Sequence, residues 1–168
     1  MMVLHGLGVT SLLLNYRYPA VGLVFGYETL SIYWLGVSVI LIYMYGFDID
    51  DTIAETDFKH SRSQVEAILG AKVKYTPSMP FVAITARGHD PKVQKATKIW
   101  LKQHQPNCEG VEFTGGSMKQ TIEGKARAIQ QHNVTDYVDN NTELLTGLKN
   151  LLPKVKFYHF SGSGYSRF

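Results

Sequence analysis

The amino-acid sequence predicts an α/β fold in which a mainly parallel sheet is flanked by helices. From about Ile40 onward, short apolar runs rich in β-branched residues alternate with longer helical patterns. Such alternation is typical of parallel sheets with right-handed crossovers. Polar residues also follow several of the predicted strands directly, which is where ligands bind in such sheets. The length of 168 residues and the 45% hydrophobic content suit one globular domain with a sizeable core.

The predicted elements follow one another from Ile40 to Phe160. The first strand, Ile40 to Phe47, is uncharged and apolar, as expected of a strand in the middle of a sheet. After it we expect helices at 61–69, 91–104, 121–132 and 142–151, and strands at 81–85, 111–113, 136–138 and 155–160. Pro91 favours a helix start because its missing N–H is not needed in the first turn. The C-terminal SGSGYSRF is low in complexity and is predicted to be mobile.

The charges divide the chain into an apolar segment, 1–39, and a domain, 40–168. Residues 1–47 contain only Arg17 and Glu28 as charged side chains. The uncharged run from Leu30 to Phe47 is long enough for a membrane span, but a core strand at 40–47 excludes a span there. Residues 1–39 are therefore interpreted first as a non-native or dispensable extension before a start at Met44. The alternatives are a membrane anchor and an added structural element.

Composition restricts the remaining classes of site. The net charge of +3 suits an anionic ligand but is common among other proteins. The lone Cys108 excludes an internal disulfide, and no paired Cys and His spacing indicates a structural zinc site. We expect a cytoplasmic protein, membrane-associated if segment 1–39 is native and inserts.

Polar side chains at three strand ends predict one site. Asp48 and Asp50 follow the first strand, Thr85 and Arg87 the second, and Asp139 the strand at 136–138. Two carboxylates two residues apart in an extended chain point to the same side and repel each other unless a cation or proton lies between them. With a third acid they form an oxygen-rich cluster suited to Mg²⁺. A single acidic turn could be a helix cap, but capping explains three such clusters poorly.

These residues carry a resemblance to the haloacid dehalogenase (HAD) superfamily. GFDIDDTIAE resembles its motif I, FVAITARG is similar to motif II, and GKARAIQQHNVTDYVDNN resembles motifs III and IV joined. The match covers Ile40 to about Phe160. It implies a Rossmann-like fold with a minimal cap, because the interval between Thr52 and Phe81 is too short for a large cap domain.

The resemblance implies a role for each matching residue. Asp48 would be the nucleophile and Asp50 the general acid and base, with Lys125 as the motif III lysine. Mg²⁺ would be held by Asp48, Asp50 through its backbone carbonyl, and Asp139. The phosphate and the rest of the substrate would contact Thr52, Thr85, Ala86 and Arg87.

Two positions depart from the pattern or leave a choice. Asn140 stands where the family often has a second acid, which affects the surroundings of the metal. Lys119 also precedes the strand at 136–138 and is the alternative candidate for the motif III lysine. We prefer Lys125, because its spacing from Asp139 better suits one helix, a turn and a strand.

The predicted function is a magnesium-dependent phosphomonoester hydrolase that works through an aspartyl-phosphate. Its substrate would be a nucleotide or a nucleic-acid 3′-phosphate end, because the chain resembles both phage polynucleotide kinase 3′-phosphatase domains and deoxyribonucleotidases. The alternatives are a HAD-type phosphotransferase with an unknown acceptor and a non-catalytic phosphate-binding module. We expect Lys92, Lys95 and Lys98 to lie on a solvated helix face. A membrane partner depends only on residues 1–39.

Overall fold

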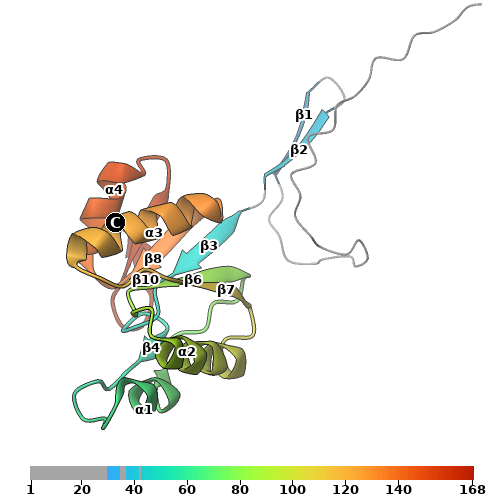
Figure 1. The fold of residues 1–168 in the computed structure, drawn as a ribbon. Coiled ribbons are helices and arrows are strands. Elements are labelled where there is room, and N and C mark those ends of the chain that lie inside the picture. The colour runs from blue at the N-terminus through green and yellow to red at the C-terminus, as the bar shows by residue number, and fades with distance from the viewer. Residues whose placement is uncertain (1–29, 35–36, 42) are drawn as a thin grey trace, which may run out of the picture.

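The computed structural model describes residues 30–34, 37–41 and 43–168 (Figure 1). Its main sheet has the strand order β10-β9-β8-β3-β6-β7. In chain order the strands are β3 (Met44–Phe47), β6 (Phe81–Thr85), β7 (Cys108–Phe113), β8 (Val134–Asp139), β9 (Lys156–Phe160) and β10 (Tyr165–Arg167). All neighbours are parallel except β9 and β10. The predicted α/β class with a mainly parallel sheet is confirmed.

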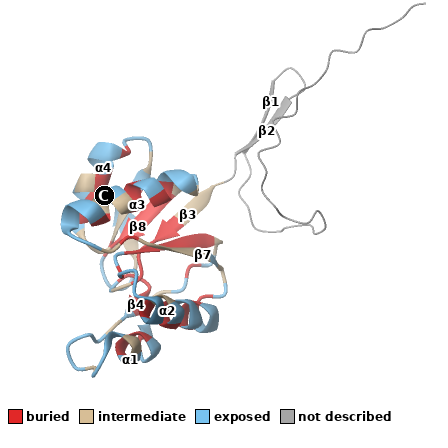
Figure 2. Ribbon diagram, viewed as in Figure 1, coloured by how far each residue is buried: buried red, intermediate tan, exposed pale blue. Residues whose placement is uncertain are grey.

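Helices cover both faces of this sheet (Figure 1). They are α1 (Gln64–Leu69), α2 (Pro91–His104), α3 (Met118–Gln131) and α4 (Thr142–Leu151). One core cluster lies under α1 and α2 and contains Trp100 and Phe47, and a second lies under α3 and α4 and contains Leu145 and Tyr137. Figure 2 shows buried residues on the strands and on the inner sides of the helices. The sheet is therefore the middle layer of three.

Side-chain caps mark the starts of the four described helices. The Ser63 hydroxyl accepts a hydrogen bond from the backbone N–H of Glu66 in α1. The Asp90 side chain accepts a hydrogen bond from the backbone N–H of Lys92 at the start of α2. Ser117 forms a capping box with Gln120 in α3, and Asn141 caps α4. Each cap satisfies N–H groups that have no partner within the helix.

The connection between β3 and β6 carries only a small flap. It consists of the short antiparallel pair β4 (Ala54–Glu55) and β5 (Lys72–Val73), with α1 between them. The flap is fixed to the domain because the Trp100 indole N–H donates to the backbone oxygen of Ala71 at 2.9 Å.

The prediction of one strand from Ile40 to Phe47 is wrong. The sheet strand begins at Met44, and Ile40 belongs to β2 (Val37–Leu41), which pairs antiparallel with β1 (Leu30–Trp34) outside the main sheet. A continuous apolar run has no periodicity that marks where one element ends and the next begins. None of the helices in the described part of the chain is long and apolar enough to cross a membrane. The remaining interpretations of segment 1–39 concern residues that mostly lie outside those described.

The prediction of a mobile C-terminus is also wrong. Tyr165 pairs with Phe160 at the start of β10, and the backbone N–H of Ser161 donates to the Gly164 oxygen at 2.9 Å in the turn between the strands. The Tyr165 ring packs edge-on against Phe47 and Tyr158. Phe168 also packs against the core, and its backbone N–H donates to the Phe157 oxygen at 2.9 Å, so a composition rich in Ser and Gly conceals two anchoring aromatic residues.

Candidate functional site

Two neighbouring strands and one helix bring three charged residues together. Asp48 follows β3, and Asp139 ends β8, which is paired with β3. Lys125 reaches between them from α3, with its Nζ 2.6 Å from Asp48 Oδ1 and 2.8 Å from Asp139 Oδ2. The Lys125 side chain is only 1% exposed. Lys119 instead lies exposed in the first turn of α3, so Lys125 is the lysine at this cluster.

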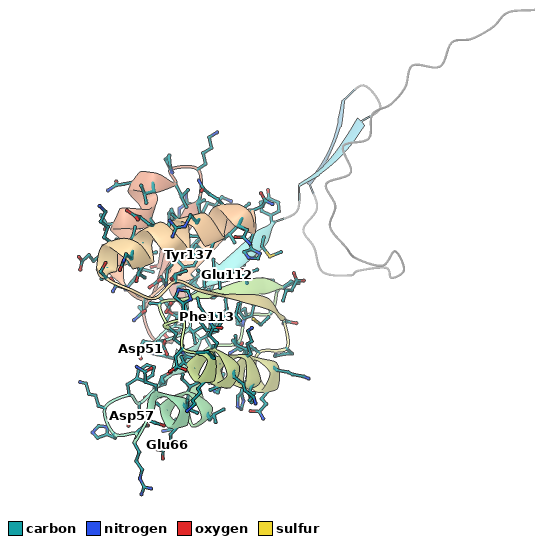
Figure 3. All side chains as sticks on the ribbon, in the orientation of Figure 1. Asp51, Asp57, Glu66, Glu112, Phe113 and Tyr137 are labelled. Atoms are coloured by element: carbon teal, nitrogen blue, oxygen red, sulfur yellow. The ribbon has the colours of Figure 1, made fainter. Side chains whose placement is uncertain are left out.

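Tyr137 belongs to the same cluster, although it is not among the site residues predicted from the sequence. Its hydroxyl accepts a hydrogen bond from Lys125 Nζ at 2.9 Å and donates to Asp139 Oδ2 at 3.0 Å. Burial raises the pKa of Tyr137 well above its usual range, and Asp139 adds to this rise. Figure 3 shows Tyr137 on the sheet beneath α3. Its position two residues before Asp139 on one strand is the signal that could have found it, because such residues share a face.

Gly46 makes room for the Tyr137 ring. The two residues are partners across β3 and β8. A Cβ atom at position 46 would lie 2.8 Å from Tyr137 Cδ2, closer than real Cβ contacts allow. The glycine therefore leaves space for the tyrosine ring, whose hydroxyl lies at the charged cluster.

The cluster holds two acids and one base away from water. Burial raises the pKa of Asp48 to about 7, Lys125 opposes the rise, and Asp139 and Asp50 add to it. Burial lowers the pKa of Lys125, but the attraction of Asp139 and Asp48 outweighs it, so the net shift is upward. With all three groups ionised, the cluster carries one buried negative charge in excess.

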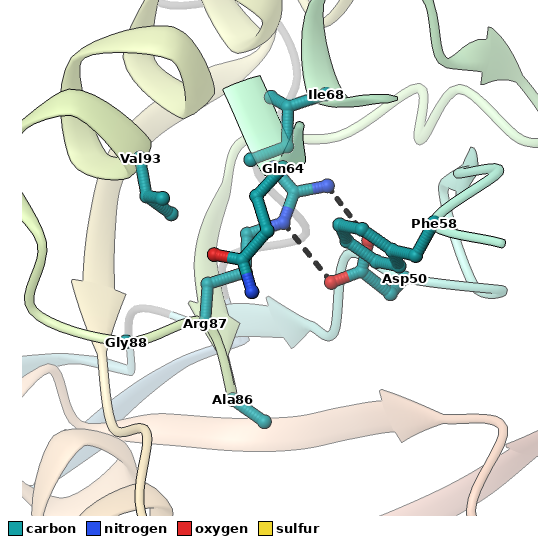
Figure 4. Close-up of a pocket in the computed structure, with 8 residues that line it drawn as sticks. All are labelled: Asp50, Phe58, Gln64, Ile68, Ala86, Arg87, Gly88 and Val93. Carbon is teal, nitrogen blue, oxygen red and sulfur yellow. Dashed lines mark hydrogen bonds and ion pairs between the residues drawn. The ribbon is translucent and has the colours of Figure 1, made fainter. Parts of the chain in front are cut away.

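Asp50 turns its carboxylate to a different partner, Arg87. Arg87 Nη2 lies 2.7 Å from Asp50 Oδ1, and Arg87 Nε lies 3.0 Å from Asp50 Oδ2 (Figure 4). The Thr56 hydroxyl also donates to Asp50 Oδ1 at 2.8 Å. The two-pronged contact between a planar guanidinium and a carboxylate is the strongest kind of ion pair in proteins. Asp50 is therefore held in one orientation.

The Arg87 side chain is buried, which excludes a position on a solvated surface. It is 6% exposed, and its Nη1 also donates to the Thr97 hydroxyl at 2.9 Å. Including a bond to Thr56, four of its donor contacts are made within the protein. A guanidinium has only five N–H donors. One N–H group, the second on Nη1, therefore remains for the substrate contact expected of Arg87.

The other residues predicted to contact the substrate lie near the cluster of Asp48, Lys125 and Asp139 or next to Arg87. The Thr52 hydroxyl is fully buried, 3.5 Å from Asp48 Oδ2 and 3.4 Å from Asn140 Oδ1. Thr85 is also fully buried, and its hydroxyl accepts a hydrogen bond from the backbone N–H of Arg87 at 3.2 Å. Ala86, in contrast, is exposed.

A cavity of about 240 Å³ opens beside Asp50 (Figure 4). The flap and the loop before α2 form its walls, which are lined by Asp50, Phe58, Gln64, Ile68, Ala86, Arg87, Gly88 and Val93. Three of the predicted site residues are among them. Asp48, Lys125 and Asp139 do not line this cavity, and each is at most 6% exposed.

The residues present fit a divalent cation only in part. In the described part of the chain, no three His, Cys, Asp or Glu side chains gather in an arrangement that could hold a metal. The Asp50 carboxylate is occupied by Arg87, which leaves Asp48 and Asp139 as carboxylate donors. Their oxygens and the buried excess negative charge suit a hard cation. A magnesium site here would thus have two carboxylates and would need backbone oxygen or water for its other ligands.

Comparison of the chain with models of protein families, with curated proteins and with solved structures found no match. The observed topology is compatible with a Rossmann-like fold.

Proposed function

We propose that this domain is a magnesium-dependent phosphomonoester hydrolase of HAD type, with Asp48 as its nucleophile. The substrate would be a nucleotide or a nucleic-acid 3′-phosphate end. One observation carries the proposal, namely the carboxylates of Asp48 and Asp139 held by a buried lysine at the carboxyl ends of two adjacent parallel strands. This edge is where α/β sheets bind their ligands.

Asp48 would form a covalent intermediate. One of its carboxylate oxygens attacks phosphorus, the bond from phosphorus to the leaving oxygen breaks, and an aspartyl-phosphate remains. Lys125 lies 2.6 Å from Asp48 and so places a positive charge next to the oxygens of the phosphoryl group in transfer. Water then attacks the phosphorus, and Asp48 leaves as a free carboxylate.

Asp50 would move the protons in both steps. It gives a proton to the leaving oxygen in the first step and takes one from the attacking water in the second. The Asp50 side chain is 28% exposed beside the cavity, while Arg87 and Thr56 hold its two oxygens. For proton transfer it must give up one of these hydrogen bonds, so Arg87 acts as its positioning residue.

A bound Mg²⁺ would supply positive charge against the repulsion between the Asp48 carboxylate and an anionic phosphate. Asp48, Asp139 and the backbone carbonyl of Asp50 would hold it. Asn140, within reach of the Thr52 hydroxyl, would face the same region through its side-chain amide.

The test is phosphate release in the presence of Mg²⁺ from p-nitrophenyl phosphate, deoxynucleoside monophosphates and a 3′-phosphorylated oligonucleotide. Asp48→Asn keeps the shape of the side chain but removes the nucleophile, so it should abolish release from every substrate that the wild type hydrolyses. Glu109→Gln is the control, because Glu109 is exposed near the start of β7, at the opposite edge of the sheet. Turnover by Asp48→Asn at the wild-type rate would refute the proposed nucleophile. Absence of release by the wild type from all three substrates would refute the proposed hydrolase.

A further inference from the structure

The positive charge of the protein is concentrated on one helix. α2 contains Lys92, Lys95, Lys98 and Lys102 and no Asp or Glu. The whole chain has 17 basic and 14 acidic residues. Without these four lysines, 13 basic residues stand against 14 acidic ones, so α2 accounts for the entire positive excess.

No carboxylate of the described residues neutralises these lysines. All four are exposed, and none of them forms an ion pair with a described Asp or Glu. Of the eight lysines outside α2, three do have such partners, namely Lys74 with Asp51, Lys125 with Asp48 and Asp139, and Lys156 with Asp136. Like charges along one helix repel each other and weaken it slightly. The arrangement is therefore not explained by the stability of α2.

The same helix face is hollowed. A shallow depression of about 440 Å³ is lined by Pro91, Gln94, Lys95, Lys98, Ile99 and Lys102. Ile99 is 38% exposed in the middle of the lysines. The depression starts at Pro91, three residues after Gly88, which lines the cavity beside Asp50. Figure 2 shows the outward side of α2 as exposed.

We propose that this face of α2, the lysine strip, binds single-stranded nucleic acid whose terminal phosphate lies in the active site. This inference rests on the proposed function and selects nucleic-acid ends over free nucleotides. Lys95, Lys98 and Lys102 share one face and span about 10 Å along the axis, at 1.5 Å per residue. One phosphate cannot contact all three, whereas a chain of phosphates can. Ile99 offers an apolar contact to a sugar or base between them.

The test is the salt dependence of oligonucleotide binding to the full chain. A fluorescent single-stranded oligonucleotide with a 3′-hydroxyl avoids any contribution from catalysis, and anisotropy gives its affinity across a range of salt concentrations. Each phosphate contact adds about 0.7 to the slope of log affinity against log salt for a single strand. The variant with Lys95→Gln, Lys98→Gln and Lys102→Gln should therefore lose about 2 from the slope. The corresponding Lys→Arg variant should keep it.

A variant with Lys72→Gln, Lys149→Gln and Lys154→Gln is the matched control. These exposed lysines lie outside α2, and their replacement changes the net charge by the same amount. An equal loss of slope in both triple variants would show a non-specific effect of net charge and would overturn the lysine strip. Absence of oligonucleotide binding at the lowest salt concentration would overturn it as well. Binding with the expected slope, but no phosphate release from any substrate, would support the strip and refute the hydrolase.

Discussion

Replacing Lys125 with Met should destabilise the domain far more than the same replacement of an exposed lysine. Met is close to Lys in length and keeps the packing of the stem, but it removes the Nζ group. The change leaves the carboxylates of Asp48 and Asp139 buried without their cation. Tyr137 also loses the donor that lies 2.9 Å from its hydroxyl.

The size of the effect follows from these contacts. Removal of one partner from a buried ion pair costs about 3–5 kcal/mol. Here one lysine serves two carboxylates. Without Lys125 the pKa of Asp48, already about 7, rises further, so Asp48 takes up a proton at pH 7 and the loss in free energy of unfolding should be about 3–5 kcal/mol. A domain of this size has about 5–15 kcal/mol in total. Adding Asp139→Asn should recover about 1–3 kcal/mol, because it removes the carboxylate that remains ionised without a cation.

Urea unfolding at pH 7, followed by circular dichroism, measures the effect. Lys149→Met is the control, because Lys149 is exposed and its change should stay within about 0.5 kcal/mol of wild type. If Lys125→Met unfolded within about 1 kcal/mol of wild type with an unchanged urea dependence, the buried cluster would not exist in solution.

Three further predictions concern the residues around this cluster. Gly46→Ala should lower the free energy of unfolding by about 1–3 kcal/mol, because the new Cβ would meet the Tyr137 ring. Gly110→Ala is the control, because there is open space around Gly110. Equal melting temperatures for the two variants would contradict this prediction. Arg87→Lys loses the two-pronged contact with Asp50 and should lower kcat by about 10- to 100-fold, because the Asp50 carboxylate is then misplaced. An unchanged kcat would rule out the positioning role of Arg87. Mg²⁺ at about 100 times its Kd should raise the free energy of unfolding by about 2.7 kcal/mol in wild type but not in Asp139→Asn. The same rise in both proteins would exclude Asp139 as a ligand of Mg²⁺.

The sequence predicted best the elements whose signals are local. The strand at 81–85 and the helices at 91–104 and 142–151 have the predicted bounds. A β-branched run that begins after Pro80, a proline at the first position of α2 and the capping Asn141 before α4 mark these elements in the sequence itself. The strand predicted at 40–47 had no such limits, since the apolar run continues across β2 and β3.

The candidate site was predictable to the extent that it depends on topology. Parallel strands bring their carboxyl ends to one edge, which is enough to place Asp48 near Asp139. The pairing of Asp50 with Arg87 joins residues 37 positions apart and depends on side-chain geometry, which the strand pattern does not contain. Tyr137 was missed for another reason, since a tyrosine within an apolar strand is usually a core residue, and here it is both core and site.

A buried ion cluster contributes little net stability, because the cost of removing its charges from water offsets their attraction. The reason why this protein retains the charges can therefore be tested. Replacing such a cluster as a whole with apolar residues of similar volume is often neutral or stabilises a protein by about 1–4 kcal/mol. The combined change Asp48→Leu, Lys125→Met and Asp139→Leu should therefore unfold at the same urea concentration as wild type or a higher one, although Lys125→Met alone is strongly destabilising. The Tyr137 hydroxyl would keep a partner in the Ile84 backbone oxygen, 3.3 Å away. If the triple variant were instead as unstable as Lys125→Met, the cluster would be required for folding, and its charges would no longer need a chemical function to explain them.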